Sequence, residues 1–258
     1  MKLICSSLSA CCLRLLCVVG LFCGASAAMA AVQVVEPYES AQPAPMTELD
    51  RLLQPGWTAV GHTFAANCSD AVFLRRVYLD VTGSLPPATV VRPFLKDQRV
   101  TKRADLIDEL LASEGYAVYW AMRWSDVLRV KSEFPINLWP NAAQAYHEWI
   151  YQSLRENKPY DLFARQLLTS SGSNFRRPEV NFYRAVQGKD AASLARAAAL
   201  AFMGTRLETW PESERLQFEA FFSRIAFKPT AEWKEEIVYV DLEQYTELAL
   251  TTPDGESI

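Results

Sequence analysis

Cysteine and histidine are scarce in this chain of 258 residues once its first thirty positions are set aside. Cys68 is then the only cysteine, and His62 and His147 are the only histidines. A zinc site needs four such ligands, or three and a water, and these residues show no zinc-site spacing, so we expect no metal. A single thiol cannot form a disulfide within the chain, so a hydrophobic core must stabilise the fold. We interpret Cys68 as an inert thiol, because a nucleophilic cysteine would need a nearby base.

Motifs for several common enzyme chemistries are also absent. The ten glycines are scattered and form no phosphate-binding loop, and no Gly-x-Ser-x-Gly segment provides a nucleophile elbow. Glu212 with Glu214, and Glu235 with Glu236, are close pairs along the chain. Glycosidase carboxylates instead face each other across a cleft, about 5 to 9.5 Å apart, which sequence neighbours rarely achieve. We therefore interpret these four glutamates as parts of solvated surfaces.

Basic residues are outnumbered by acidic ones, and the formal net charge is −4. Residues 1–30 contain Lys2 and Arg14 and no acid, so their removal would take the charge to about −6. An acidic balance disfavours binding to nucleic acid and to an anionic membrane surface. We expect neither as a partner.

The first thirty residues are typical of a secretory signal peptide. A basic start is followed by a short apolar run at 15–22 and by small residues at 25–30 that suit a signal peptidase. The apolar run is shorter than the about 20 residues that span a hydrocarbon core. We predict export to the periplasm or the extracellular space, with a mature chain that begins near Ala31 and has no stable membrane span. An uncleaved anchor is the alternative.

The rest of the chain divides by composition into a linker, a helical region and a β tail. Residues 31–45 are rich in proline and polar residues and predict a flexible linker. Apolar residues recur at helical spacing over 46–230, most clearly along 142–156. The segment 236–242 is β-rich, and Pro253-Asp-Gly255 signals a turn after which only three residues remain. We expect a mainly α fold: one multi-helix domain with a short C-terminal β segment at 231–258, interpreted as the start of a truncated following domain.

Local signals within the helical region predict where individual helices begin and end. Gly83 and Gly204 suit left-handed helix ends, and Asn157 followed by Pro159 ends the helix at 142–156. Val118 and Met122 belong to the apolar pattern of the helix at 116–130. The other predicted helices start near 69, 87 and 101 or span 160–168, 190–203 and 212–227.

An ordered series of motifs resembles a large bacterial protein family of unknown function. It opens with Phe-Leu-Arg-Arg-Val-Tyr-Leu-Asp-Val-Thr-Gly-Ser-Leu-Pro-Pro at residues 73–87. It continues through 119–126, 147–149, 157–161, 171–176, 180–185 and 202–207, and the similarity covers roughly residues 46–240. Members of that family are exported, often with a planctomycete-type cytochrome c domain upstream and a second uncharacterised domain downstream. The resemblance implies export beside a second domain and carries no activity.

Many members of that family follow the last motif with Cys-x-x-Cys-His, the attachment pattern of c-type haem. The corresponding positions here are Thr209, Glu212 and Ser213, so both thiols and the proximal histidine are missing. Trp210 and Pro211, with the segment 233–238, resemble a branch of the family that lacks the signature. The resemblance therefore implies a haem-less scaffold, and we expect no covalent haem and no other cofactor.

Three classes of function remain. We favour an exported binding or assembly module whose partner is a protein or a polysaccharide, because seven tryptophans and 12% aromatic residues fit such contacts. Core packing explains aromatic residues equally well, and the alternative is an enzyme or enzyme subunit that acts on polysaccharide or a related extracellular substrate. Electron transfer is disfavoured by the missing haem ligands.

The candidate catalytic residues of the enzyme alternative are polar side chains inside the matched motifs: Asp126, His147, Asn181, Tyr183 and Arg184. On sequence alone, His147 beside Glu148 is more typical of a solvated or core-edge histidine than of a base. Clustering of these residues around one cleft would favour the enzyme. Exposed aromatic rings would favour the binding module.

Overall fold

The computed structural model describes residues 37–38, 47–62, 66–133 and 138–243. The predicted signal peptide, most of the predicted linker and the turn signal at 253–255 lie outside these residues. The chain divides into two compact units, with the boundary between Ser69 and Asp70. None of the described helices combines the length and the apolar character needed to span a membrane.

The first unit contains one described helix, α2 (Glu48–Ala59), none of whose residues is buried. A capping box fixes its start: the Thr47 hydroxyl accepts from the Asp50 amide at 3.2 Å, and the Asp50 carboxylate accepts from the Thr47 amide at 2.8 Å. In the same unit, Tyr38 and Cys68 form an isolated antiparallel bridge, and Cys68 is half-buried.

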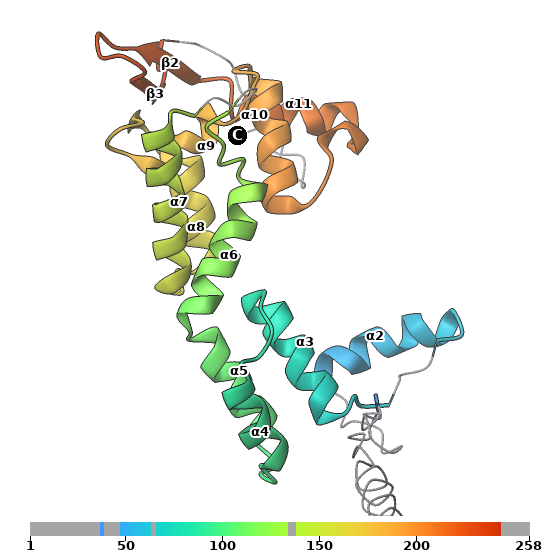
Figure 1. The fold of residues 1–258 in the computed structure, drawn as a ribbon. Coiled ribbons are helices and arrows are strands. Elements are labelled where there is room, and N and C mark those ends of the chain that lie inside the picture. Colours follow the sequence, from blue (N-terminus) through green and yellow to red (C-terminus); the bar gives the residue numbers. More distant parts are fainter. Residues whose placement is uncertain (1–36, 39–46, 63–65, 134–137, 244–258) are drawn as a thin grey trace, which may run out of the picture. The chain divides into compact units, whose positions relative to one another are not determined.

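The second unit is mainly helical and ends in a small sheet (Figure 1). In chain order it contains α3 (Asp70–Thr82), α4 (Ala88–Lys96), α5 (Lys102–Leu111), α6 (Glu114–Val127), α7 (Pro140–Arg155), α8 (Tyr160–Leu168), β1 (Gly172–Ser173), η1 (Pro178–Val180), α9 (Asn181–Arg184), α10 (Ala191–Ala198), η2 (Ala199–Met203), η3 (Leu207–Thr209), α11 (Glu212–Ala220), β2 (Ile225–Pro229) and β3 (Glu236–Val240). The mainly α prediction is confirmed.

Helix ends in this unit follow the local signals of the sequence. Gly83 closes α3 with φ of 66°, Asn157 follows α7 with φ of 49°, and Gly204 follows η2 with φ of 63°. Glycine is also required at 83 because a Cβ atom there would lie 2.2 Å from the Tyr119 ring. These three predicted helix ends are confirmed.

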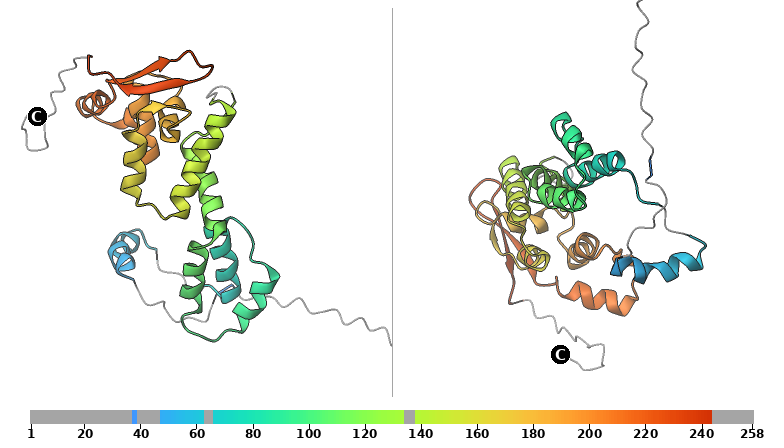
Figure 2. Two further views of the ribbon diagram at one scale, coloured as in Figure 1. Left: turned by 90° about the vertical axis from the view of Figure 1, so that its left-hand side faces the viewer. Right: turned by 90° about the horizontal axis from the view of Figure 1, so that it is seen from below.

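The prediction of a last helix at 212–227 is wrong beyond Ala220. Helix α11 ends there, and Phe227 lies in β2, opposite Val238 of β3 in antiparallel register. The left view of Figure 2 shows the two strands, coloured orange-red to red, side by side. Pairing with β3, whose Val238 is fully buried, replaces helical hydrogen bonds by sheet hydrogen bonds over this segment.

The buried face of α6 also differs from the predicted pattern. Val118 and Met122 are 54% and 51% exposed, whereas Ala117 and Ala121 are buried. Helix α6 packs along α7, and small alanine side chains allow the two helices to approach closely. The predicted apolar stripe of α7 is confirmed, because Tyr146 and Ile150 are fully buried.

Two hydrophobic clusters stabilise the second unit. The smaller one contains Leu74 and Tyr78 of α3 with side chains of α4 and α5. The larger one contains side chains of α6, α7, α8, α9 and α10. Val238 of β3 also belongs to it, so it connects these helices to the sheet. Strand β3 is the central strand in the order β1-β3-β2, so the sheet is fixed to the helices through its middle strand.

Candidate functional site

The five candidate catalytic residues fall into two groups with different environments. Asp126 on α6 and His147 on α7 are exposed, and their side chains make no hydrogen bond or ion pair with any other described residue. Asn181, Tyr183 and Arg184 lie together on α9, where the first two are fully or almost fully buried. The two larger cavities described below have none of the five in their walls.

Arg184 and Asn181 belong to a group of paired polar side chains. Arg184 Nε donates to Glu236 Oε2 at 3.2 Å and Arg184 Nη1 donates to Asn181 Oδ1 at 3.0 Å. Lys189 forms a second ion pair with Glu236, and Asn181 Nδ2 donates to the carbonyl of Pro178 at 3.0 Å. The Arg184 and Glu236 side chains are only 11% and 19% exposed. These contacts attach β3 to the segment around α9.

Asn174 completes this group. It is fully buried; its Oδ1 accepts from the backbone N–H of Glu236 at 2.9 Å, and its backbone N–H donates to the Glu236 carbonyl at 3.2 Å. We call Asn174, Asn181, Arg184, Lys189 and Glu236 the sheet-anchoring cluster. Because its members satisfy one another, the motifs at 171–176 and 180–185 contribute to the fold at this place.

Tyr183 is also buried and hydrogen-bonded within the fold. Its hydroxyl donates to the Leu168 carbonyl at 2.5 Å, and the residue is 1% exposed. Burial raises the pKa of the Tyr183 hydroxyl far above its ordinary value of 10.0, since the phenolate would lose its solvation. A phenol held in this way does not act as a base near neutral pH.

The positions that the sequence analysis aligned with a haem signature are exposed residues of η3 and α11. The Thr209 hydroxyl donates to the Arg206 carbonyl at 2.7 Å, and Glu212 and Ser213 start α11 as exposed residues. No grouping of three or more metal-binding side chains occurs within the described ranges.

A concave surface lies where the start of α6 meets the end of α7. A cavity of about 650 Å³ there adjoins one of about 190 Å³, and both are lined by Tyr116, Leu154 and Asn157. We call the two together the Tyr116 trough. Its remaining walls are Asp108, Leu111, Ala112, Ser113, Glu114, Ala117, Arg155 and Glu156 in the larger part, and Trp124, Ser153, Lys158, Tyr160 and Phe163 in the smaller part.

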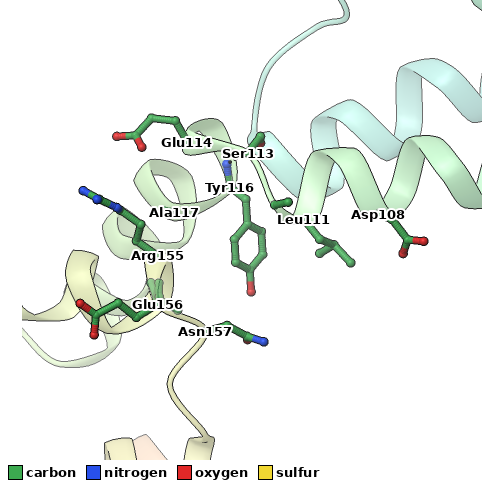
Figure 3. Close-up of a pocket in the computed structure, with 11 residues that line it drawn as sticks. Asp108, Leu111, Ser113, Glu114, Tyr116, Ala117, Arg155, Glu156 and Asn157 are labelled. Atoms are coloured by element: carbon green, nitrogen blue, oxygen red, sulfur yellow. Dashed lines mark hydrogen bonds between the residues drawn. The ribbon is translucent and has the colours of Figure 1, made fainter.

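The caps of the two helices position the trough. Ser113 is the N-cap of α6, accepting from the Tyr116 amide at 3.3 Å and donating to the Leu110 carbonyl at 2.6 Å. It thereby places Tyr116 in the first turn. Figure 3 shows the Tyr116 ring between the α5 side, with Leu111, and the Asn157 side. The left-handed Asn157 turns the chain out of α7 at this point.

The larger part of the trough is polar and mainly acidic. Asp108, Glu114 and Glu156 contribute carboxylates and Arg155 contributes one guanidinium. Glu114 accepts a hydrogen bond from the Tyr151 hydroxyl, and this bond raises the pKa of that hydroxyl. The side chains of Asp108 and Glu156 have no hydrogen bond or ion pair to another residue in the described ranges, so they can bind a ligand.

The smaller part of the trough is aromatic. The Trp124 ring centroid lies 6.0 Å from that of Tyr160 and 5.2 Å from that of Phe163. Lys158 is held at its edge, donating to Ser153 Oγ at 2.9 Å and to Gln166 Oε1 at 2.8 Å. The trough therefore offers hydrogen-bonding groups at one end and apolar ring surface at the other.

The sequence analysis did not select these residues as a site. Asn157, Lys158 and Tyr160 lie inside the motif at 157–161, which is the signal that points to them. Glu114, Tyr116 and Arg155 lie outside the matched motifs, and only the packing of α6 along α7 brings them to the same place.

A family model confirms part of the resemblance. The PSCyt2 model, described as a protein of unknown function (DUF1549), matches residues 48–226. The match covers more than half of the chain, which therefore belongs to this family. No curated protein and no solved structure matches the chain.

Proposed function

We propose that this PSCyt2-family chain is an exported, haem-less binding module whose Tyr116 trough holds a segment of an extracellular polysaccharide. The observation that carries the proposal is the meeting of the exposed Tyr160 ring and the half-buried Tyr116 and Trp124 rings with unpaired hydrogen-bonding side chains in one concave surface. Export and the lack of covalent haem rest on the sequence, and binding rests on the trough.

The aromatic end suits the apolar face of a sugar ring. A sugar presents C–H groups on its faces and hydroxyl groups around its rim, and aromatic side chains offer a flat apolar surface for the faces. Tyr160 is 53% exposed, and its hydroxyl is fixed by a 3.1 Å hydrogen bond to the Phe202 carbonyl. Its ring is therefore held in place before a ligand binds, which lowers the entropy cost of binding.

The polar end suits the hydroxyl groups of a neighbouring sugar. Asp108 and Glu156 supply acceptors, Asn157 supplies an amide that both donates and accepts, and Arg155 supplies donors. A few placed polar groups beside an apolar surface are the usual composition of a small-molecule site. A volume of about 650 Å³ for the larger part is also within the usual range.

The same geometry favours binding over hydrolysis. A glycosidase needs one carboxyl group that burial keeps protonated. Asp108, Glu114 and Glu156 are all exposed to solvent. Asp126 and His147 are also exposed, and Tyr183 is buried in the core. The enzyme alternative therefore has no set of converging groups among the described residues.

Calorimetric titration of the mature chain with a panel of neutral and acidic oligosaccharides tests this proposal. The matched variants are Tyr160→Ala and Phe221→Ala, which remove aromatic side chains of similar exposure, 53% and 58%, inside and outside the trough. We expect binding of a panel member that Tyr160→Ala weakens at least about tenfold, since ring contacts contribute about 1 kcal/mol or more. Phe221→Ala should leave it unchanged. Absence of binding across the panel, or equal weakening by both variants, would show that the trough is not a saccharide site.

Export has its own test. Mass spectrometry of the protein recovered outside the cytoplasm should give an N-terminus near Ala31, because the small residues at 25–30 suit cleavage. Recovery there of a chain that retains Met1 would contradict the cleavage.

The absence of covalent haem is tested by a spectrum. The chain is produced in cells with a working haem-attachment system and extracted with acid and acetone. We expect no remaining Soret band, because Thr209 and Glu212 cannot form thioether bonds. A band that survives extraction would show that the chain carries covalent haem.

A further inference from the structure

A second cavity of about 640 Å³ lies away from the Tyr116 trough and shares none of its residues. Three arginines from three segments line it: Arg129 after α6, Arg196 on α10 and Arg206 before η3. We call it the arginine cavity. Glu208 is the one acidic residue in its wall, so positive charge dominates here although the whole chain has a formal net charge of −4.

Two of the three guanidinium groups have no protein partner within the described ranges. The side chains of Arg129 and Arg206 make no hydrogen bond and no ion pair with residues described there. Arg196 is oriented by a 3.0 Å hydrogen bond to Ser193 Oγ, and its contact with Glu208 is long, at 3.8 Å. Neighbouring like charges repel one another, so their gathering around one cavity is stabilised when an anion binds between them.

Arg129 occupies a backbone conformation that favours another residue. Its φ is 59°, in the left-handed region that glycine and asparagine adopt most readily at a helix end. An arginine there costs stability relative to glycine, about 1 kcal/mol. Arg129 is one of the residues that line the cavity, so in exchange for this cost it supplies a positively charged side chain there.

We infer that the arginine cavity binds a small molecule or sugar that carries a tetrahedral oxyanion group, a phosphate or a sulfate ester. Guanidinium groups donate two parallel hydrogen bonds to such oxygens, and several of them together match a group with three or more acceptor oxygens. The cavity is much larger than one such group, so the ester's organic part occupies the remaining volume.

The decisive variant is Arg129→Gly. It removes a guanidinium and at the same time relieves the left-handed backbone, so the fold should gain stability while anion binding falls. If Arg129 had only a structural role, its replacement would change the stability of the fold without weakening anion binding. Arg206→Gln is the second binding variant, and Arg92→Gln, an exposed arginine on α4 outside the cavity, is the matched control.

The experiment titrates the mature chain with inorganic phosphate, sulfate and chloride at constant ionic strength, and then with glucose 6-phosphate and glucose 6-sulfate. We expect phosphate or sulfate, but not chloride, to bind, and Arg129→Gly and Arg206→Gln each to weaken that binding at least about tenfold. Arg92→Gln and Tyr160→Ala should leave it unchanged, which separates this site from the trough. Stronger binding of the phosphate ester identifies phosphate as the recognised group, and stronger binding of the sulfate ester identifies sulfate.

Equal responses to all three inorganic anions would overturn the inference. So would binding that Arg129→Gly leaves unchanged, provided that the variant melts at or above the temperature of the unmodified chain. Neither result would bear on saccharide binding in the trough, because the two sites share no residue.

Discussion

The sheet-anchoring cluster and the Tyr116 trough both contain polar residues of the family motifs, but their surroundings differ. In the cluster, Asn174 is buried, the Arg184 side chain is 11% exposed, and both are bonded to Glu236. In the trough, Asn157 and Glu156 are exposed, and their side chains have no partner among the described residues. The comparison shows that a polar residue in a motif can be bonded within the fold or left unpaired at the surface, and only the unpaired kind is available to the ligand that we propose.

The largest expected effect is on the cluster. Glu236→Ala should lower the free energy of unfolding by about 3 kcal/mol, because it leaves the nearly buried Arg184 guanidinium without its carboxylate. Urea unfolding followed by circular dichroism measures the change. Glu212→Ala is the control: that side chain is 82% exposed and lies 3.9 Å from Arg215, so the loss should stay under about 1 kcal/mol. Equal losses of unfolding free energy in the two variants would contradict the structural role that we assign to the cluster.

Tyr183→Phe should have a smaller effect. The variant keeps the buried ring but removes the donor to the Leu168 carbonyl, which costs about 1 to 2 kcal/mol. The same urea titration measures it, and saccharide affinity should stay constant. A variant that folded normally but lost saccharide binding would place Tyr183 at the binding site and contradict the division drawn above.

The buried tyrosines also predict a loss of stability at high pH. Burial raises the pKa of Tyr146 and Tyr183 above 10.0 in the folded state, so unfolding favours loss of their protons. Their contribution is complete below pH 10 and decreases as the pH rises through and above that value, by up to about 1.4 kcal/mol per pH unit for each group. Urea unfolding at pH 9 and 11 should show the decrease, and Tyr183→Phe should make it shallower. If the free energy of unfolding decreased as steeply with pH in Tyr183→Phe as in the unmodified chain, Tyr183 would not contribute to the decrease.

Much of the fold follows from local signals in the sequence. The bounds of α8 and the left-handed ends at Gly83 and Gly204 depend on residues within a few positions of each other, and they were predicted correctly. Strand β2 was not, because its conformation depends on pairing with β3 and not on its own residues. The exposure of Val118 was missed for a related reason, since the neighbour α7 decides which face of α6 is buried.

The candidate site was less predictable than the fold. Membership in a motif selected Asp126 and Asn181 alike, although one is exposed and the other is fully buried. Hydrogen bonds and ion pairs within the chain distinguish such residues, and these contacts form only in the folded protein. The trough joins Tyr116 to Asn157 across two helices, so no spacing in the sequence indicates it.

The smallest expected change in stability belongs to the trough, and it is also the sharpest test of the comparison. Asn157→Gly keeps a residue that readily adopts the observed φ of 49° while it removes the amide from the trough. Stability should stay within about 0.5 kcal/mol of the unmodified chain, because glycine is the usual residue at such a helix end. Saccharide affinity should nevertheless fall several-fold, because a group that donates and accepts hydrogen bonds is lost. Calorimetry and urea unfolding on the same preparation measure both quantities. If affinity and stability instead changed together, as they should for a member of the sheet-anchoring cluster, Asn157 would have to be counted with the residues that build the fold.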